Sequence, residues 1–128
     1  MTHLVDVNLL LALAWSNHAD HAKARAWWLG LKKDDAIATC ALTELGFVRV
    51  SLHTAAAVDM LQVKQALVQL RTARPGHVFL PDALGADALP TWVKTARQST
   101  DGHLAALAAA QGAQLVTLDK GIPGARLL

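Results

Sequence analysis

Two short apolar runs, one near each end of the chain, finish in an acidic residue. Residues 4–6 read Leu-Val-Asp, and residues 115–119 read Leu-Val-Thr-Leu-Asp. Short apolar runs that contain β-branched residues are typical of buried parallel strands. The pattern therefore predicts one strand that ends at Asp6 and another that ends at Asp119.

A helical pattern precedes the second of these strands. Leu104 and Leu107 are spaced by three residues within an alanine-rich run. Thr100 and Asp101 carry the short oxygen side chains that favour a helix start, and Gly112 favours a helix end. We expect a helix that begins near Asp101 and ends before Gly112, so that a carboxylate lies at its amino end.

Two central helices are predicted from the same periodicity. The first is expected to bury one apolar face, formed by Leu42, Leu45, Val48 and Leu52. The second is expected to begin at Thr54, continue through Val58 and end near Arg74, just before a Pro-Gly pair.

The remaining elements follow from the same patterns. We expect helices at 9–14 and 21–31, strands at 36–39 and 77–80, loops or short helices over 83–98, and a closing strand within 122–128. Because strands and helices alternate, the sequence predicts an α/β fold with a mainly parallel sheet and helices on both faces. We expect residues 1–128 to form a single domain.

Composition narrows the class of protein. Hydrophobic residues make up 53% of the chain and charged residues 17%, which excludes a disordered chain. The net charge of +2 permits a polyanionic partner. Cys40 is the single cysteine, which excludes an internal disulfide and favours a reducing cytoplasm. The apolar runs are shorter than the roughly 20 residues of a membrane span, so we expect a cytoplasmic protein without a membrane partner.

Four acidic residues stand at predicted strand ends or helix starts: Asp6, Glu44, Asp101 and Asp119. Carboxyl ends of parallel strands and amino ends of the following helices share one edge of a sheet, where ligands bind. Two unit charges about 4 Å apart repel by about 4 kcal/mol at an effective dielectric of about 20. Four carboxylates gathered there would therefore require protons or a cation.

The oxygen ligands of such a pocket favour Mg²⁺, or Mn²⁺, over zinc. A bound divalent cation activates water and offsets charge on a phosphodiester, so the pattern points to metal-dependent phosphodiester hydrolysis. Simpler interpretations exist for single members, because Asp6 also suits a turn and Glu44 also suits the amino end of a helix dipole.

Polar and cationic residues near these acids give further candidates. Asn8 suits either a helix cap or an amide that holds a neighbouring carboxylate. Lys94 and Arg97, with Trp92 beside them, suit contacts with an RNA backbone or base, and Arg49 is a third candidate cation. Each of these cations is equally consistent with a solvated surface charge.

Four motifs spread over the chain carry a family resemblance. They are Val-Asp-Val-Asn at 5–8, Thr-Glu-Leu-Gly-Phe-Val-Arg-Val at 43–50, Thr-Asp-Gly-His-Leu-Ala-Ala-Leu-Ala at 100–108 and Leu-Val-Thr-Leu-Asp-Lys-Gly at 115–121. In this combination they resemble the PIN-domain ribonucleases, specifically the VapC toxins of bacterial toxin–antitoxin modules. The resemblance covers essentially the whole chain.

The resemblance implies a three-layer α/β/α PIN fold with a central sheet of four to five strands. It also implies Mg²⁺- or Mn²⁺-dependent endoribonuclease activity on an RNA substrate, a homodimer, and inhibition by a cognate antitoxin protein. By motif position, the catalytic and metal-site residues are Asp6, Glu44, Asp101 and Asp119, and the supporting polar groups are Asn8 and Thr117. Gly102 departs from many relatives, which carry a larger residue there, and glycine lowers helix propensity by about 1 kcal/mol relative to alanine.

Two other functions compete with the nuclease. One is a receiver-like signalling domain, in which Asp6, Asp82 and Lys120 would form a phosphoacceptor site with Mg²⁺. The other is a catalytically silent PIN-like module that uses the acidic pocket to hold a basic partner segment. The receiver reading leaves Glu44 and Asp101 without a role, and the silent module has no need to concentrate four acids.

Overall fold

The computed structural model describes residues 1–57 and 59–128. The strands are β1 (Thr2–Val5), β2 (Ala36–Cys40), β3 (Val78–Leu80), β4 (Gln114–Thr117) and β5 (Arg126–Leu127). The helices are α1 (Val7–Ala14), α2 (His21–Leu29), α3 (Ala41–His53), α4 (Met60–Thr72), α5 (Ser99–Ala110) and two short 3₁₀ helices, η1 (Ala86–Ala88) and η2 (Ala96–Gln98). No helix within the described ranges has the length and apolar character needed to cross a membrane.

All five strands form one parallel sheet in the order β3-β2-β1-β4-β5, which confirms the predicted α/β class. The order reverses between β1 and β4, where Leu4 pairs with Leu115 and Val5 pairs with Val116. In sheets of this kind ligands bind beyond the carboxyl ends of the strands at the point of reversal. Asp6 directly follows β1, and Asp119 closely follows β4.

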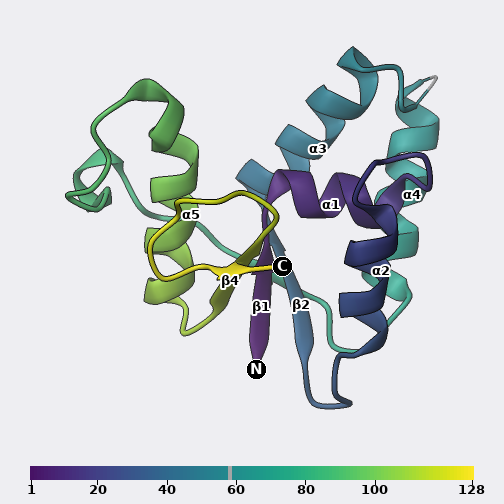
Figure 1. Ribbon diagram of the computed structural model, residues 1–128, viewed down its shortest axis with the longest axis horizontal. Coiled ribbons are helices and arrows are strands. Elements are labelled where there is room, and N and C mark those ends of the chain that lie inside the picture. The colour runs from purple at the N-terminus through teal and green to yellow at the C-terminus, as the bar shows by residue number, and fades with distance from the viewer. Residues whose placement is uncertain (58) are drawn as a thin grey trace.

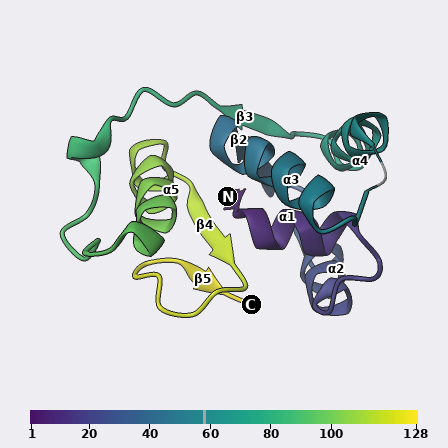
Figure 2. The ribbon, with the colours of Figure 1, turned by 90° about the horizontal axis from the view of Figure 1, so that it is seen from above.

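Helices cover both faces of the sheet, as Figures 1 and 2 show, with α1 to α4 on one side and α5 on the other. Neighbouring strand residues point to opposite faces, so each strand supplies both cores. Val5 and Val116 pack with Leu9 and Phe47 on the α1–α4 side, whereas Leu4 packs with residues of α5 on the other. This arrangement explains why the strands are apolar runs rather than alternating patterns.

The predicted buried face of α3 is wrong at Leu45 and Leu52, whereas Leu42 and Val48 are half-buried and pack against the cores. Leu45 is 65% exposed and Leu52 is 37% exposed. The residues of α3 that are buried instead are Thr43, Gly46, Phe47 and Ser51. A Cβ at Gly46 would lie 2.6 Å from Val7 Cγ2 of α1. The close approach of α1 therefore selects the glycine face of α3, and the leucines are left near the surface.

The predicted start of α4 is also wrong. Thr54 caps the carboxyl end of α3, where its backbone N–H and its hydroxyl both donate to the Val50 carbonyl. The N-cap of α4 is Asp59, whose carboxylate accepts a hydrogen bond from the Gln62 N–H at 2.9 Å. Aspartate is among the best N-cap residues, so it sets the helix start. Val58, which was predicted to lie within this helix, is outside the described residues.

Candidate active site

Asp6 lies at the junction of β1 and α1 and is only 3% exposed. Its Oδ1 accepts a hydrogen bond from the Leu9 N–H at 2.8 Å, so Asp6 is the N-cap of α1. Its Oδ2 accepts a hydrogen bond from the hydroxyl of Thr117. The parallel register of β1 with β4 brings these two side chains together, because Val5 and Val116 are partners and Asp6 and Thr117 follow them.

Asp119 is held beside Asp6 by two groups. Its backbone N–H donates to Thr117 Oγ1 at 2.9 Å. Asn8 Nδ2 lies 3.0 Å from each carboxylate oxygen of Asp119. Of the two roles predicted for Asn8, the structure therefore shows the amide that holds a carboxylate, and Asp6 rather than Asn8 caps the helix.

Asp101 reaches the same place from the opposite face of the sheet, in the first turn of α5. The residue after it, Gly102, is buried, and a Cβ there would lie 2.2 Å from Val93 Cγ2. The absence of a side chain therefore lets the segment that contains Val93 pack directly on the first turn of α5. This close contact explains the glycine at position 102, despite its low helix propensity.

The three aspartates form a cluster with unneutralised negative charge. Burial raises the pKa of Asp6 to about 6 from the ordinary 3.8, against hydrogen bonds from Thr117 and Leu9 that lower it, and repulsion from Asp119 and Asp101 raises it further. Burial also raises the pKa of Asp101, again with repulsion from Asp119. Here we call these three residues the aspartate cluster.

An open pocket of about 670 Å³ lies over the aspartate cluster. It is lined by Asn8, Trp92, Arg97, Gln98, Asp101, Asp119, Lys120 and Gly121. The charge of Arg97 opposes the rise in the pKa of Asp101, which places this cation close to the acids. The lining of the pocket therefore combines two carboxylates, Asp101 and Asp119, with two cations, Arg97 and Lys120.

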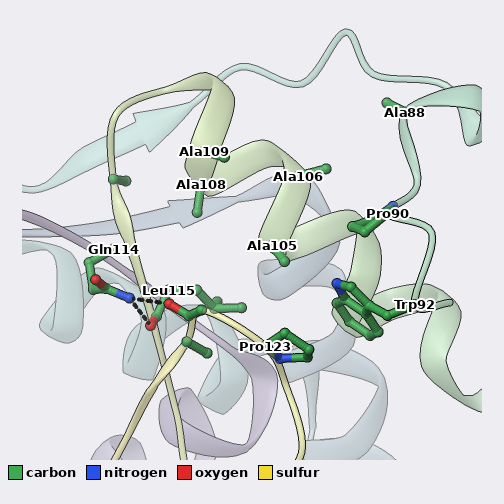
Figure 3. A pocket seen from close by; sticks show the side chains of 13 residues that line it. Ala88, Pro90, Trp92, Ala105, Ala106, Ala108, Ala109, Gln114, Leu115 and Pro123 are labelled. Atoms are coloured by element: carbon green, nitrogen blue, oxygen red, sulfur yellow. Dashed lines mark hydrogen bonds between the residues drawn. The ribbon is translucent and has the colours of Figure 1, made fainter.

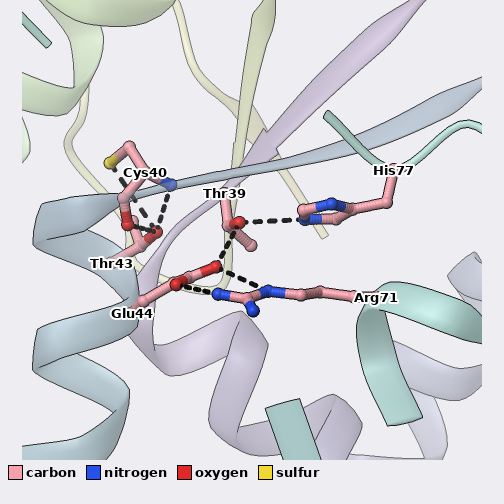
Figure 4. A network of polar contacts seen from close by, with 6 residues as sticks. All are labelled: Thr39, Cys40, Thr43, Glu44, Arg71 and His77. Atoms are coloured by element: carbon pink, nitrogen blue, oxygen red, sulfur yellow. Dashed lines mark hydrogen bonds and ion pairs between the residues drawn. The ribbon is translucent and has the colours of Figure 1, made fainter. Parts of the chain in front are cut away.

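Glu44 does not join the aspartate cluster in this structure. Its Oε1 accepts hydrogen bonds from the Thr39 hydroxyl at 2.7 Å and from Arg71 Nε at 3.0 Å, and its Oε2 forms an ion pair with Arg71 Nη2 (Figure 4). His77 Nε2 lies 2.9 Å from Thr39 Oγ1. Because the Thr39 hydroxyl donates to Glu44, the His77 N–H donates to Thr39.

Burial lowers the pKa of His77, and the nearby charge of Arg71 lowers it further. The imidazole therefore stays neutral in the presence of the Arg71–Glu44 pair. Of the four carboxylates predicted to share one pocket, three therefore lie together. The fourth, Glu44, is neutralised by an arginine of the same chain.

The donor set of the aspartate cluster fits a hard divalent cation. It offers carboxylate oxygens whose mutual repulsion a cation would relieve, without competing nitrogen or sulfur ligands. As the side chains lie, the residues that the structure describes contain no group of three His, Cys, Asp or Glu side chains arranged to chelate one ion. The fit is therefore one of charge and donor chemistry, with Asp6, Asp101 and Asp119 as the residues that would hold the ion.

The three cations predicted to contact RNA lie in different places. Arg97 lines the pocket over the aspartate cluster. Lys94 is exposed in the loop before η2, where its backbone N–H donates to Gln98 Oε1. Arg49 is exposed on α3 and is not among the residues that line this pocket.

The receiver-like arrangement is not formed. Asp82 accepts a hydrogen bond from the Leu84 N–H and pairs with His103 of α5, and its pKa is lowered chiefly by that histidine. Lys120 instead lines the pocket over the aspartate cluster. The strand order 3-2-1-4-5 also differs from the order 2-1-3-4-5 of the receiver fold.

Sequence reasoning missed Arg71 as the ion-pair partner of Glu44, and His77 as a partner of the Thr39 hydroxyl that donates to Glu44. Arg71 lies in the last turn of α4, where a cation suits the helix dipole without any partner. It is 27 residues from Glu44, and no local pattern links two residues so far apart. Only the packing of α4 beside α3 brings them together.

Comparison with known proteins defines the family. The profile of the PIN domain matches residues 3–126. Ribonuclease VapC38 of Mycobacterium tuberculosis is 44% identical over 124 residues, which cover 93% of this chain and 86% of VapC38. Ribonuclease VapC39 of the same organism is 38% identical over 128 residues, covering 95% and 91%. The chain therefore belongs to the PIN-domain family and, within it, to the VapC ribonucleases.

Solved structures agree on the fold. A crystal structure of M. tuberculosis VapC20, described as a toxin that cleaves the sarcin-ricin loop, has a TM-score of 0.65 at 15% identity and covers 93% of this chain and 89% of its own. A structure of VapBC2 from Rickettsia felis, bound to a DNA fragment from its promoter, has a TM-score of 0.62 at 18% identity and covers 100% and 98%. These identities support the shared architecture alone.

Proposed function

We propose that this protein is a Mg²⁺- or Mn²⁺-dependent endoribonuclease that acts as the toxin of a toxin–antitoxin module, with the aspartate cluster as its catalytic centre. The observation that carries this proposal is the gathering of Asp6, Asp101 and Asp119 at the point where the strand order reverses. A cation bound there supplies an activated water and charge compensation for cleavage of a phosphodiester.

Hydrogen bonds within the chain hold two of the carboxylates of the site in place. The Leu9 N–H and the Thr117 hydroxyl fix Asp6, and the amide of Asn8 fixes Asp119. Fixed carboxylates need little rearrangement to receive a cation, which is the usual role of such supporting hydrogen bonds. Arg97 and Lys120 at the pocket wall attract the phosphates of the RNA backbone.

The partners in this proposal are an RNA substrate, a cognate antitoxin protein and a second copy of the chain in a homodimer, with action in the cytoplasm. The VapBC2 structure of R. felis supports the antitoxin, because its name denotes a toxin with its partner. In such a complex a basic antitoxin segment would complement the unneutralised charge of the aspartate cluster.

The direct test is cleavage of total cellular RNA by the purified protein with Mg²⁺, with Mn²⁺ and with EDTA. We expect discrete cuts that require the metal and that disappear in Asp101→Asn. Asp34→Asn is the matched control, because Asp34 is an exposed aspartate outside the pocket. Folded protein, free of antitoxin, that cuts no RNA under any condition would favour the catalytically silent module instead.

A further inference from the structure

A second cleft adjoins the pocket over the aspartate cluster. It has a volume of about 400 Å³ and lies between α5, the loop before it and the turn after β4 (Figure 3). Its walls include Trp92, Ala105, Ala109, Gln114 and Pro123. Clefts of roughly 300 Å³ or more are large enough to enclose a small ligand or a nucleobase. We call it the alanine cleft.

Trp92 connects the two cavities, because its side chain lines both the alanine cleft and the pocket over the aspartate cluster. It is half-buried and packs on the core between the sheet and α5. A ligand that places its charged part at Arg97 and Lys120 therefore meets an aromatic wall at the entrance to an apolar cleft. Single-stranded RNA has this pattern of charge and apolar surface, since each phosphate is followed by a base with a π-face.

We propose that the alanine cleft receives an unstacked base of the RNA substrate, next to the phosphate bound at the aspartate cluster. This inference rests on the proposed function and specifies how that site selects its RNA. The alanines of α5 leave the room for a base, and Trp92 supplies the aromatic surface on which it stacks.

Gln114 gives the cleft a polar group of fixed orientation. Its Nε2 donates to the carbonyls of Leu115 at 3.1 Å and Gly124 at 2.9 Å. Both N–H bonds of the amide are therefore used within the chain, and Oε1 is its remaining hydrogen-bonding atom. Figure 3 shows Trp92 on one side of the cleft and Gln114 on the other. A base held between them has the Trp92 ring for stacking on one side.

Filling the cleft without touching the aspartate cluster tests this inference. Ala109 and Ala110 are neighbours near the end of α5, both are exposed, and only Ala109 lines the cleft. Leucine is a good helix former, so Ala109→Leu and Ala110→Leu are a matched pair of variants. Both are placed in the Asp101→Asn background with Mg²⁺, so that the RNA remains intact during binding.

The probes are a fluorescein-labelled RNA of random sequence about 12 nucleotides long and an abasic ribose-phosphate oligomer of the same length. We expect the parent and Ala110→Leu to bind the RNA roughly tenfold or more tightly than the abasic oligomer. In Ala109→Leu this preference is lost, whereas affinity for the abasic oligomer is unchanged. In the Asp101-intact protein, Ala109→Leu also changes which sites are cut.

Other outcomes overturn the inference in distinguishable ways. If Ala109→Leu and Ala110→Leu bind RNA alike while the parent cuts RNA, the proposed function stands and the cleft takes no base. If Ala109→Leu changes the oligomeric state at unchanged RNA affinity, the cleft is an interface between copies of the chain. If the parent neither binds nor cuts RNA, the proposed function fails together with the inference.

A second pair of variants tests the aromatic wall. Trp28 is also half-buried, but it lines a cavity formed by α1, α2 and α4. Trp92→Leu should reduce the preference for RNA over the abasic oligomer, and Trp28→Leu should leave it unchanged. Equal losses in both variants would mean that the tryptophans act only through folding, which contradicts a stacking role for Trp92.

Discussion

The aspartate cluster and Glu44 lie at the ends of neighbouring strands of the same sheet, and they differ in what neutralises their negative charge. The aspartate cluster follows β1 and β4 and begins α5. Burial raises the pKa of Asp6 and Asp101, and repulsion among the members of the cluster raises it further. Glu44 follows β2 and is paired with Arg71 and hydrogen-bonded to Thr39. The charge of Glu44 is therefore neutralised within the fold, whereas the charge of the aspartate cluster would be neutralised by a bound cation.

The difference shows that position at the ligand-binding edge does not decide the role of a carboxylate. Glu44 and Asp101 have similar positions within their elements, because each lies in the first turn of a helix. Arg71 reaches Glu44 from α4 and forms an ion pair with it, whereas Arg97, whose charge acts on Asp101, lines the open pocket. Unneutralised charge therefore distinguishes a site prepared for a ligand from a pair that joins two helices.

The largest expected difference between the two groups is in RNA cleavage. Asp101→Asn should lower the cleavage rate on the order of 100-fold or more, because it removes a carboxylate from the aspartate cluster. Glu44→Gln should lower it by less than about tenfold, because the change removes a charge that Arg71 neutralises and leaves the aspartate cluster intact. Initial rates with Mg²⁺ on one RNA substrate measure both. A rate loss in Glu44→Gln as large as in Asp101→Asn would contradict the different roles assigned to Glu44 and the aspartate cluster.

The next effect is on stability against pH in metal-free buffer. The folded protein holds the Asp6 proton up to a pKa of about 6, whereas the unfolded chain releases it near 3.8. Deprotonation therefore costs stability as the pH rises from about 4 to 6, by roughly 3 kcal/mol in total, and the loss is complete above that range. Asp6→Asn has no carboxyl group to deprotonate at this position. Its free energy of unfolding should therefore increase relative to that of the parent between pH 4 and 6.

Asp35 provides the control of opposite sign. Its pKa is lowered, first by the hydrogen bond from the Lys32 N–H and further by His3. Its contribution to stability is present above the unfolded pKa and is lost as the pH falls. Asp35→Asn should therefore fall behind the parent as the pH rises to about 4, and the difference between the two should stay constant between pH 4 and 6. Free energies of unfolding of Asp6→Asn and the parent that differ by the same amount at every pH would contradict the raised pKa of Asp6.

Removing the cation from the neutralised pair should have a smaller effect on folding. Arg71→Met leaves Glu44, which is 13% exposed, without two hydrogen bonds, and should reduce the free energy of unfolding by about 2 kcal/mol. Combining Arg71→Met with Glu44→Met should recover most of this loss, because no unpaired charge remains. Arg49→Met, at an exposed position, should have almost no effect. Equal losses in the single and double variants would show that Arg71 acts by packing alone.

The smallest expected effect concerns the packing that positions Asp101. Gly102→Ala places a methyl group against Val93 and should destabilise the protein by about 1 kcal/mol despite the better helix propensity of alanine. Adding Val93→Ala should remove the clash and restore the stability. Thermal unfolding of the three proteins measures this. A single variant more stable than the parent would mean that Val93 moves aside without cost.

The strands and the aspartates were predictable because their signals are local. Apolar runs that end in Asp6 and Asp119 fixed two adjacent parallel strands, and the register then required their ends to meet. The face of α3 was not predictable, since it depends on the approach of Val7 to Gly46. The Arg71 partner of Glu44 was missed for the same reason. The buried face of α3 and the Arg71–Glu44 pair both depend on contacts between helices that are far apart in sequence. The periodicity of a single helix carries no information about such contacts.

The most direct test is calorimetric titration of Mn²⁺ into the parent, Asp101→Asn and Glu44→Gln. Loss of a carboxylate from the aspartate cluster should weaken binding about tenfold or more in Asp101→Asn. Glu44→Gln should bind Mn²⁺ within about twofold of the parent, because Arg71 already neutralises Glu44. If Glu44→Gln weakens binding as much as Asp101→Asn does, Glu44 leaves Arg71 to join the cation, and the division into two groups of carboxylates is wrong.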